Sequence, residues 1–375
     1  MNVLGIETSC DETAAAVVTT TGDPARPWRM LSNVIASQVE IHREWGGIVP
    51  EIASRQHIRD ICGVVERALA DAGCDWRGPR GIDALAVTQG PGLVGSLLVG
   101  VAFAKAAAAA LDKPIVAVHH LAGHIESIFL EHGTIPLPAA VLVVSGGHTS
   151  LYIVPEPGVY DLVGRTRDDA AGEAYDKVAR LLGLGYPGGP AVDRLARTGN
   201  DQAIPMPRQK FTHADRNPSP ANLKVEFSFS GLKTAVVRLL HDRGVAVGTG
   251  LVVPTDAGPL DQAAVADFCA SFQRVVVETL LDRTFETARR LGARSVAISG
   301  GVSANSRLRA DAIARGAREQ LPVFIPALAL ATDNAAMIAA AGLRRLERGE
   351  HSALDFNAAA SLAIQNSEFR IQNSE

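Results

Sequence analysis

Val3-Leu4-Gly5-Ile6-Glu7 begins the chain as a short apolar strand, Thr8 to Thr13 read as a polar turn, and Ala14-Ala15-Ala16-Val17-Val18 reads as a second apolar strand. Two such runs joined by a short polar turn predict a β-hairpin. The same layout recurs between Ala140 and Val154, where the turn reads Ser145-Gly146-Gly147-His148-Thr149. The recurrence indicates an internal repeat.

A later pair of segments supports the repeat. Asp83 to Gly92 and Arg294 to Ser303 each read as a strand, a glycine-rich loop and the start of a helix. In each half, a helical pattern lies between the hairpin and this later segment. The two patterns are Ile58 to Ala72 and Gln262 to Leu291. Hairpin and strand-loop-helix therefore occur twice in the same order, which predicts two α/β domains with mixed sheets.

The composition is that of a globular protein, since 47% of the 375 residues are hydrophobic and 20% are charged. The net charge of −4 gives no global positive field that would attract nucleic acid or an acidic membrane, so any RNA contact must come from a local basic patch. Residues 201–261, rich in proline and then in glycine and valine, predict surface excursions or a lid.

Several features predict a cytoplasmic protein. The four cysteines lack paired short spacing, so neither a zinc knuckle nor a disulfide framework is expected. The N-terminus reaches Glu7 without the basic and long apolar regions of a signal peptide. Leu93 to Leu111 is long and apolar, but Lys105 and two glycines interrupt it, so it predicts a buried helix and no membrane partner.

His120 and His124 are the strongest local signal for a metal. Their i, i+4 spacing places both rings on one face of a helix, within reach of one ion. A helical metallopeptidase motif needs Glu directly after the first His, and that place holds Leu121. The alternative is a pair of half-buried histidines beside a strand end, and His119 and His132 nearby complicate the assignment.

Asp333 is the best distant carboxylate for the same ion. Taken alone, it reads as the N-cap of the Ala-rich helix that follows, and the two roles can coexist.

Glycine-rich turns predict a site for a phosphate-like anion. Ser145 to His148 and Gly300 to Ser303 leave backbone N–H groups open, although each is also an ordinary turn. Together with the polar turn at Glu7 to Thr13, they suggest a nucleotide between two related domains. No segment matches the P-loop pattern.

Two further segments carry charged candidates. Capping of the next helix explains Asp168 or Asp169. Asp176 and Lys177 are less easily explained in this way, because the glycine-rich stretch Gly183 to Pro190 could fold back over the same ligand, and Asp193 could then bind a ribose or an amine. The stretch from His42 to Arg59 collects three arginines and two histidines and predicts an RNA-facing strip. Its alternative is a solvated helix start whose charge Glu51 and Asp60 offset.

Together these residues resemble a known family. The run from Lys105 to Ile125 resembles the signature once attached to a "glycoprotease" family, whose members are tRNA N6-adenosine threonylcarbamoyltransferases of the bacterial TsaD type. Further matching motifs, spread over residues 1–350, are Glu7 to Thr13, Val49-Pro50-Glu51, Gly90-Pro91-Gly92, Val144 to His148, Tyr186 to Gly189, Phe227 to Lys233, Gly300 to Asn305 and Thr332-Asp333-Asn334.

The resemblance implies an α/β fold of the duplicated actin-like, sugar-kinase and Hsp70 (ASKHA) type, with two mixed-sheet domains around a central nucleotide cleft. The expected N-terminal domain spans 1–118 and is completed by roughly 333–355. The expected C-terminal domain spans 119–332, with an insertion around 241–261, and residues 356–375 form a disordered tail. The stretch Gly244 to Gly258 and the repeated tail depart from the family pattern.

The resemblance also implies the chemistry. His120, His124 and Asp333 would bind one divalent metal ion per subunit, Fe²⁺ or alternatively Zn²⁺. The residues expected to hold threonylcarbamoyl-AMP are Val143, Val144, Ser145, Gly146, Gly147, Asp176, Gly189, Asp193 and Asn305. The threonylcarbamoyl group would move to N6 of adenosine 37 in tRNAs that read codons starting with A, releasing AMP, with the metal assisting.

An exocyclic adenine amine is a weak nucleophile, so a group must accept its proton, and Asp11 in the first turn is assigned this role. The resemblance implies three partners, namely tRNA, a TsaB-like paralogous subunit and a TsaE-like ATPase. Two other functions compete with this one. A zinc metallopeptidase would use His120 and His124, and a non-catalytic ATP-binding scaffold would need only the nucleotide turns.

Overall fold

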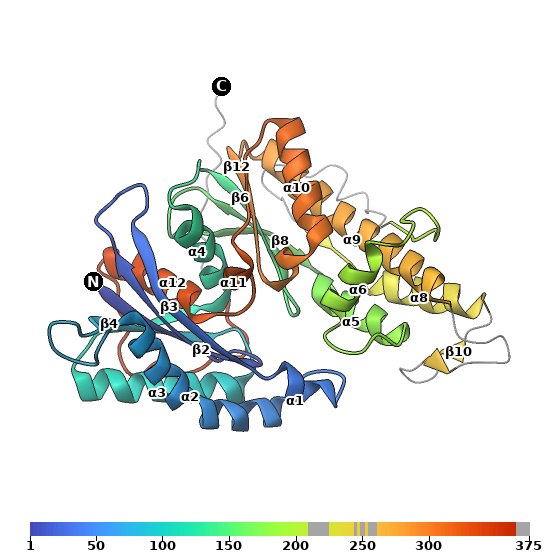
Figure 1. The fold of residues 1–375 in the computed structure, drawn as a ribbon. Helices are drawn as coiled ribbons and strands as arrows, with labels where there is room; N and C mark the ends of the chain where they lie inside the picture. Colours follow the sequence, from blue (N-terminus) through green and yellow to red (C-terminus); the bar gives the residue numbers. More distant parts are fainter. Residues whose placement is uncertain (209–224, 244–245, 248–251, 254–260, 365–375) are drawn as a thin grey trace. The chain divides into compact units, whose positions relative to one another are not determined.

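A computed structural model of the chain describes residues 1–208, 225–243, 246–247, 252–253 and 261–364 (Figure 1). The described residues form two compact units. The first contains Met1–Leu137, Val154–Tyr160 and residues 326–364, and the second contains Pro138–Ile153 and the described part of Asp161–Ile325.

The first unit is built on a five-stranded sheet in the order β3-β2-β1-β4-β5. The predicted hairpin is confirmed, because β1 (Asn2–Glu7) pairs antiparallel with β2 (Glu12–Thr20), which pairs antiparallel with β3 (Trp28–Ser37). On its other side β1 runs parallel to β4 (Ala84–Gly90), and β4 runs parallel to β5 (Ile115–His119). The carboxyl ends of β1, β4 and β5 therefore share one edge of the sheet.

Helices cover both faces of this sheet. Leu4 and Ile6 share a core with residues of α2 (Pro50–Ala72) and α3 (Val94–Leu111). Gly5 points the other way, toward α12 (Ala335–Glu347), where a Cβ would lie 2.3 Å from the Ala335 carbonyl oxygen. Burial on both faces explains why β1 reads as a continuous apolar run. The remaining helices of this unit are α1 (Val39–Arg43), α4 (His120–His132) and α11 (Leu328–Ala331).

Helix α3 is the one described helix that is long and apolar enough to cross a membrane by length and composition alone. It packs against β4 and α2, and 33% of it is buried. Its buried side includes Leu97, Val101 and Ala104, whereas Val94 and Leu98 are exposed. The helix predicted to be buried therefore contributes one side to the core.

The second unit repeats the strand order of the first. Its sheet runs β13-β12-β6-β7-β8-β9, so β6 lies between β7 and a parallel β12, as β1 lies between β2 and β4. The repeat predicted from the sequence is thus confirmed, with β9 as an additional strand parallel to β8. The strands are β6 (Ala139–Val144), β7 (Thr149–Val154), β8 (Asp161–Thr166), β9 (Val225–Phe227), β12 (Ser295–Ser299) and β13 (Val323–Phe324).

A single hydrophobic core joins this sheet to its helices, through residues such as Leu142, Tyr175 and Phe272. The helices are α5 (Ala171–Leu181), α6 (Gly188–Ala196), α8 (Ser230–His241), α9 (Gln262–Arg290), the 3₁₀ helix η2 (Gly301–Ala304) and α10 (Ser306–Glu319). In the predicted insertion, β10 (Ala246–Val247) pairs antiparallel with β11 (Val252–Val253). The predicted lid lies partly outside the described residues.

The boundaries of the two units differ from the predicted ones. Residues 119–137 and 154–160 belong to the first unit, because α4 packs on α12 and the two are joined by a buried ion pair of Glu126 and Arg344 at 3.0 Å. The Tyr160 hydroxyl donates a hydrogen bond to the same Glu126 carboxylate. The C-terminal completion begins at Pro326, earlier than the expected residue 333.

The prediction of a disordered tail from residue 356 was wrong for residues 356–364. These residues are bound to β4 and α3, for example by a hydrogen bond from the Ala359 N–H to the Gln89 carbonyl oxygen at 2.8 Å. Phe356 and Ala358 also pack against the core, but two apolar residues are too few to predict an element, and the backbone bonds leave no sequence pattern. Residues 365–375, which contain the repeated sequence, lie outside the described part of the chain.

Candidate functional site

The first unit brings His120, His124 and Asp333 together. Helix α4 begins at His120 and places His124 one turn later, with ring centroids 4.8 Å apart. The Asp333 Oδ1 lies 3.6 Å from His120 Nε2 and 3.1 Å from His124 Nε2. One ligand atom from each residue falls within 4.8 Å of the others. The cluster predicted from residues 213 positions apart in the chain therefore forms.

Asp333 is not the helix cap that the sequence alone suggested. The N-cap of α12 is Asn334, whose Oδ1 accepts a hydrogen bond from the Met337 N–H at 3.0 Å. Because Asn334 fills the capping place, the carboxylate of Asp333 faces the two histidines.

Glu7 and Ser9 hold the other ring nitrogen of His120. The Nδ1 of His120 lies 3.1 Å from Glu7 Oε2 and 3.2 Å from Ser9 Oγ. Glu7 is fully buried at the end of β1 and also accepts hydrogen bonds from the Thr88 hydroxyl and the Ser9 N–H. A carboxylate on Nδ1 keeps a proton there, so Nε2, which faces Asp333, is the ring nitrogen through which His120 could bind an ion.

The charges of this cluster perturb its titration. Burial alone lowers the pKa of His120, but the carboxylates of Asp333 and Glu7 outweigh burial and raise that pKa to about 9. For Glu7, burial raises the pKa, but His120 and the hydrogen bonds outweigh it and leave the pKa below its usual value. Without a metal, His120 and Glu7 thus form a buried ion pair.

The donor set fits a divalent transition metal. Two imidazoles and one carboxylate suit iron(II) and zinc, and the bond from His120 Nδ1 to a buried carboxylate is the usual support for a metal-binding histidine. Burial lowers the pKa of the neighbouring His119 to about 4, so His119 is neutral and serves as the N-cap of α4 through its Nδ1. The cluster is thus built on a fixed helix start.

Asp11 lies in the same unit, in the turn between β1 and β2. Burial and the charge of Asp333 raise its pKa, and its side chain is half-buried. Burial and Asp11 likewise raise the pKa of the Cys10 thiol well above its usual value. Asp11 is therefore more basic than an ordinary surface aspartate.

The glycine-rich turns lie in the second unit and contact each other there. The turn after β6 closes through bonds from the Ser145 N–H to the His148 carbonyl oxygen and from the His148 N–H to Ser145 Oγ. Gly300, with a φ of 90°, would place a Cβ 2.4 Å from the Val144 carbonyl oxygen. Only glycine fits there. Gly146 and Gly147 are exposed, with open space beside their Cα atoms.

The other predicted substrate residues lie near these turns but already have partners. Asp176 Oδ1 accepts from the Gly188 N–H at 2.7 Å, beside Gly189. Asp193 Oδ1 accepts from the Ser306 hydroxyl at 2.8 Å, and Arg197 lies 3.3 Å from its Oδ2. Asn305 caps α10 through Leu308 and donates to Gln273 Oε1 at 2.8 Å. Val143 pairs with Ser299 across the sheet.

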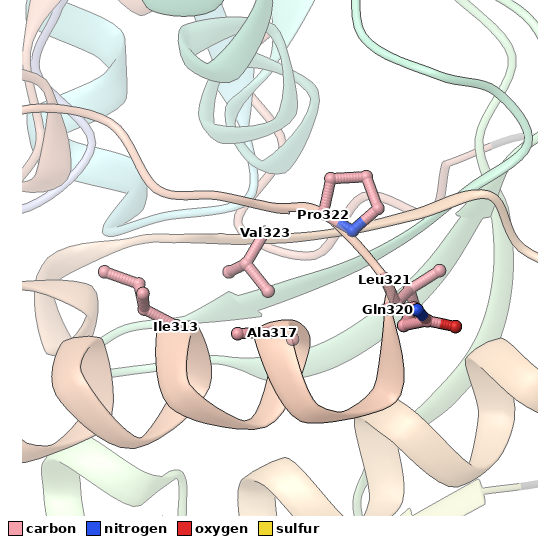
Figure 2. A pocket seen from close by; sticks show the side chains of 7 residues that line it. Ile313, Ala317, Gln320, Leu321, Pro322 and Val323 are labelled. Atoms are coloured by element: carbon pink, nitrogen blue, oxygen red, sulfur yellow. The ribbon is translucent and has the colours of Figure 1, made fainter.

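The second unit also contains a small apolar pocket at the other end of α10 (Figure 2). Ile313, Ala317 and Val323 line it, and the Gln320 amide is its polar side chain. It lies away from Asn305, which precedes the start of α10. With no charged group, it does not suit an adenylate.

Two predictions about charged residues need correction. Asp168 caps α8 and not α5, since it accepts hydrogen bonds from the Phe229 N–H and the Ser230 hydroxyl, and Asp169 pairs with Lys177 at 2.6 Å. The prediction failed because Asp168 bonds to residues more than 60 positions later in the chain, and a local sequence pattern does not show such a contact.

In the predicted RNA-facing strip, His42 and His57 are fully buried. Arg43 and Arg55 are exposed but pair with Glu40 and Glu51, so the alternative of a solvated helix start explains much of this strip.

The sequence reading missed Glu7 as a partner of His120. The signal was available in the strand order, because parallel β1, β4 and β5 end at the same edge and α4 starts at the end of β5. This arrangement places Glu7, at the end of β1, near His120, the first residue of α4.

The fold is of the ASKHA type. A structure of full-length HypF in the phosphate- and nucleotide-bound form aligns with a TM-score of 0.55 at 14% identity, over 94% of this chain and 47% of that chain. Component A of the (R)-2-hydroxyglutaryl-CoA dehydratase of Acidaminococcus fermentans aligns with a TM-score of 0.50 at 13% identity, over 93% of this chain and 98% of that chain. At such identities the likeness concerns the fold, and it confirms the predicted fold class.

Sequence relatives define the family. The family model of TsaD, tRNA N6-adenosine threonylcarbamoyltransferase, matches residues 29–340. Proteins of that name from Anaeromyxobacter dehalogenans (strain 2CP-C) and Moorella thermoacetica are 51% and 48% identical, over 95% and 97% of this chain and 97% of each relative. The chain belongs to the TsaD family of tRNA threonylcarbamoyltransferases, which are enzymes of the acyltransferase type.

Proposed function

We propose that the protein transfers the threonylcarbamoyl group of threonylcarbamoyl-AMP to N6 of adenosine 37, in tRNAs that read codons starting with A, and releases AMP. The observation that carries the proposal is the cluster of His120, His124 and Asp333, formed in a chain of this family. The expected compartment is the cytoplasm, and the expected partners are a TsaB-like subunit and a TsaE-like ATPase.

His120, His124 and Asp333 would hold one divalent ion, Fe²⁺ in preference to Zn²⁺. When bound, the ion supplies a Lewis acid that polarises a carbonyl oxygen. Glu7 keeps the Nδ1 proton of His120 in place, and the buried start of α4 holds both imidazoles on one side. These residues thus offer the ion two neutral nitrogens and one carboxylate oxygen.

Asp11 would accept the proton that the adenine amine loses on attack. Its raised pKa supports this role, since a base is more effective when its pKa lies closer to the working pH. The N6–carbon bond forms, the bond from the carbamoyl carbon to the AMP phosphate oxygen breaks, and AMP leaves with the electron pair.

The second unit would bind the adenylate. Val143, Val144, Ser145, Gly146 and Gly147 offer backbone groups at an open turn that a phosphate can approach. Asp176, Asp193 and Asn305 are proposed to shape the adjoining surface, since their described bonds fix the starts of α6 and α10. Gly189, in the first turn of α6, is proposed to leave room there for the substrate.

The proposal is tested by incubating the protein with unmodified tRNA, threonine, bicarbonate, ATP and the two partner proteins. Mass spectrometry of the digested tRNA should detect N6-threonylcarbamoyladenosine at position 37. A matched reaction with His124→Ala should give none, and a reaction without the TsaD-family protein is the second control. A complete mixture that leaves the tRNA unmodified would reject the proposal.

The peptidase alternative gains no support from α4. Leu121 occupies the place of the general base, and the next carboxylate, Glu126, is bound to Arg344 and Tyr160. A zinc-loaded protein that releases no peptide from a denatured casein substrate would remove this alternative. The scaffold alternative leaves the His120–His124–Asp333 cluster without a role.

A further inference from the structure

Residues 352–362, called here the C-terminal strap, cross the edge of the first sheet next to the metal cluster. At its start, the Ser352 N–H donates to the Ile115 carbonyl oxygen at 2.8 Å, and the Ser352 hydroxyl accepts from the Ala117 N–H at 3.0 Å. Further along, the Phe356 carbonyl oxygen accepts from Lys105 Nζ at 2.9 Å. The strap therefore follows β5 and reaches α3.

The middle of the strap binds the end of β4 and the loop that leads from it to α3. The Ala359 N–H donates to the Gln89 carbonyl oxygen at 2.8 Å, and the Ala360 carbonyl oxygen accepts from the Gly92 N–H at 3.2 Å. At Gly90 an added Cβ would lie only 2.0 Å from the Ala359 carbonyl oxygen. The last residue of β4 thus lacks a side chain at the point where the strap crosses it.

The end of the strap meets the histidine that precedes the first metal ligand. His119 Nε2 donates to the Leu362 carbonyl oxygen at 3.0 Å, while its Nδ1 accepts the Leu121 N–H at 3.1 Å. A neutral imidazole carries one proton, so the bond to Leu362 fixes it on Nε2 and leaves Nδ1 able to cap α4. The strap and the start of α4 are therefore both bonded to the imidazole ring of His119.

A second path leads from the strap to His120. The loop that the strap binds continues to Leu93, whose N–H donates to the Ser9 carbonyl oxygen at 2.8 Å. Ser9 Oγ in turn lies 3.2 Å from His120 Nδ1. Both neighbours of the metal-binding ring, His119 in sequence and Ser9 in space, are thus held by elements that contact the strap.

We propose that the C-terminal strap is a positioning element of the metal site, which orients His120 through His119 and through the Gly90–Leu93 loop. The inference rests on the metal site of the proposed function. None of the strap residues is fully buried, and the segment is held by hydrogen bonds and by the packing of Phe356 and Ala358 at the margin of the core, so it belongs to the less stable parts of the unit. Release of the strap would leave the cluster assembled but less rigid, with weaker metal binding.

A truncation series tests the proposal, with Co²⁺ alone as the probe. The metal-free full-length chain and chains ending at residues 364, 361 and 351 are titrated with Co²⁺, and its visible absorption reports affinity and ligand geometry. We expect 1–364 to match the full chain and 1–351 to lose about 10–100-fold in affinity, the effect typical of removing support around a metal ligand. The chain 1–361, which lacks Leu362, should show a smaller loss and an altered spectrum.

His119→Asn supplies a second variant if a truncated chain fails to fold. Asparagine retains an oxygen for capping but lacks the imidazole Nε2 that binds Leu362, so it should weaken Co²⁺ binding while the chain remains folded by circular dichroism. Parent affinity and spectrum in folded 1–361 and His119→Asn would overturn the strap proposal. Failure of the full-length chain to bind Co²⁺ would instead overturn the metal site itself.

Discussion

The two ring nitrogens of His120 have different partners, Glu7 and Ser9 at Nδ1 and Asp333 at Nε2. Burial lowers the pKa of this ring, yet the two carboxylates raise it to about 9. In the metal-free protein this raised pKa stabilises the fold below about pH 6.5, and the contribution is lost as the pH rises through about 9. A metal must therefore compete with a proton at His120.

Proton release should accompany metal binding. Between pH 7 and pH 9 we expect the apparent affinity for Zn²⁺ to rise about tenfold per pH unit, because each binding event displaces one proton from His120. Isothermal titration calorimetry in buffers of different ionisation enthalpy measures the protons released. Asp333→Asn, which removes the charge nearest Nε2, should release fewer. An affinity that stays constant over this pH range would contradict the raised pKa.

Glu7→Gln should weaken metal binding. The carboxylate accepts bonds from Thr88, Ser9 and His120, whereas an amide has one acceptor oxygen and must leave a donor unpaired. We expect a loss of about 10–100-fold in Co²⁺ affinity. Thr88→Ser keeps the hydroxyl and serves as the matched control. Equal affinities of Glu7→Gln and the parent would show that Glu7 does not orient His120.

Asp11→Asn tests the proposed base. The rate of transfer should fall by about 10²–10⁴-fold, while Co²⁺ affinity stays at the parent value. In the parent protein the rate should rise with pH through the raised pKa of Asp11, since the deprotonated form acts as the base. Single-turnover transfer to tRNA, followed across pH, measures both effects. A variant that transfers at the parent rate would remove Asp11 from the mechanism.

Helix α2 anchors the turn that carries Asp11. From this helix His57 Nε2 donates to the Cys10 carbonyl oxygen at 2.9 Å, and its Nδ1 lies 2.8 Å from Thr13 Oγ1. Burial lowers the pKa of His57, in keeping with a neutral ring. The helix thus connects the turn between β1 and β2 to the hydrophobic core.

His57→Leu should therefore destabilise the protein by about 1–3 kcal/mol, because it leaves the Cys10 carbonyl and the Thr13 hydroxyl buried without partners. Urea denaturation followed by circular dichroism measures the change. Arg55→Ala lies on the exposed side of the same helix and should change the stability by less than about 0.5 kcal/mol. Similar losses from both substitutions would argue against the anchoring role.

Sequence patterns predicted the elements better than the contacts between them. The duplicated strands and the His120–His124 spacing depend on local periodicity, which a single chain displays directly. Glu7 was missed as a partner because its contact requires the parallel register of three strands. The strap was missed because many of its contacts are hydrogen bonds of backbone groups, which are the same in every sequence, and only Phe356 and Ala358 pack against the core.

At the scale of the whole molecule, each unit should respond to its own ligand. Zn²⁺ at 100 times its dissociation constant stabilises the state that binds it by about 2.7 kcal/mol. Hydrogen exchange should therefore slow in α4 and at the start of α12 when Zn²⁺ is added, and around the Ser145–Gly147 turn when AMP is added. His124→Ala should abolish only the first response. Slowing by AMP confined to the first unit would contradict the assignment of adenylate residues.

The first unit is discontinuous in sequence, since β1 packs against α12 through Gly5 and the second unit is inserted between them. Asp333 leaves the ribosome 209 residues after His124. At ordinary synthesis rates this interval is about 10–40 s. During that time the nascent chain carries two histidines without their carboxylate partner, so the predicted metal-binding set is incomplete until Asp333 has been synthesised.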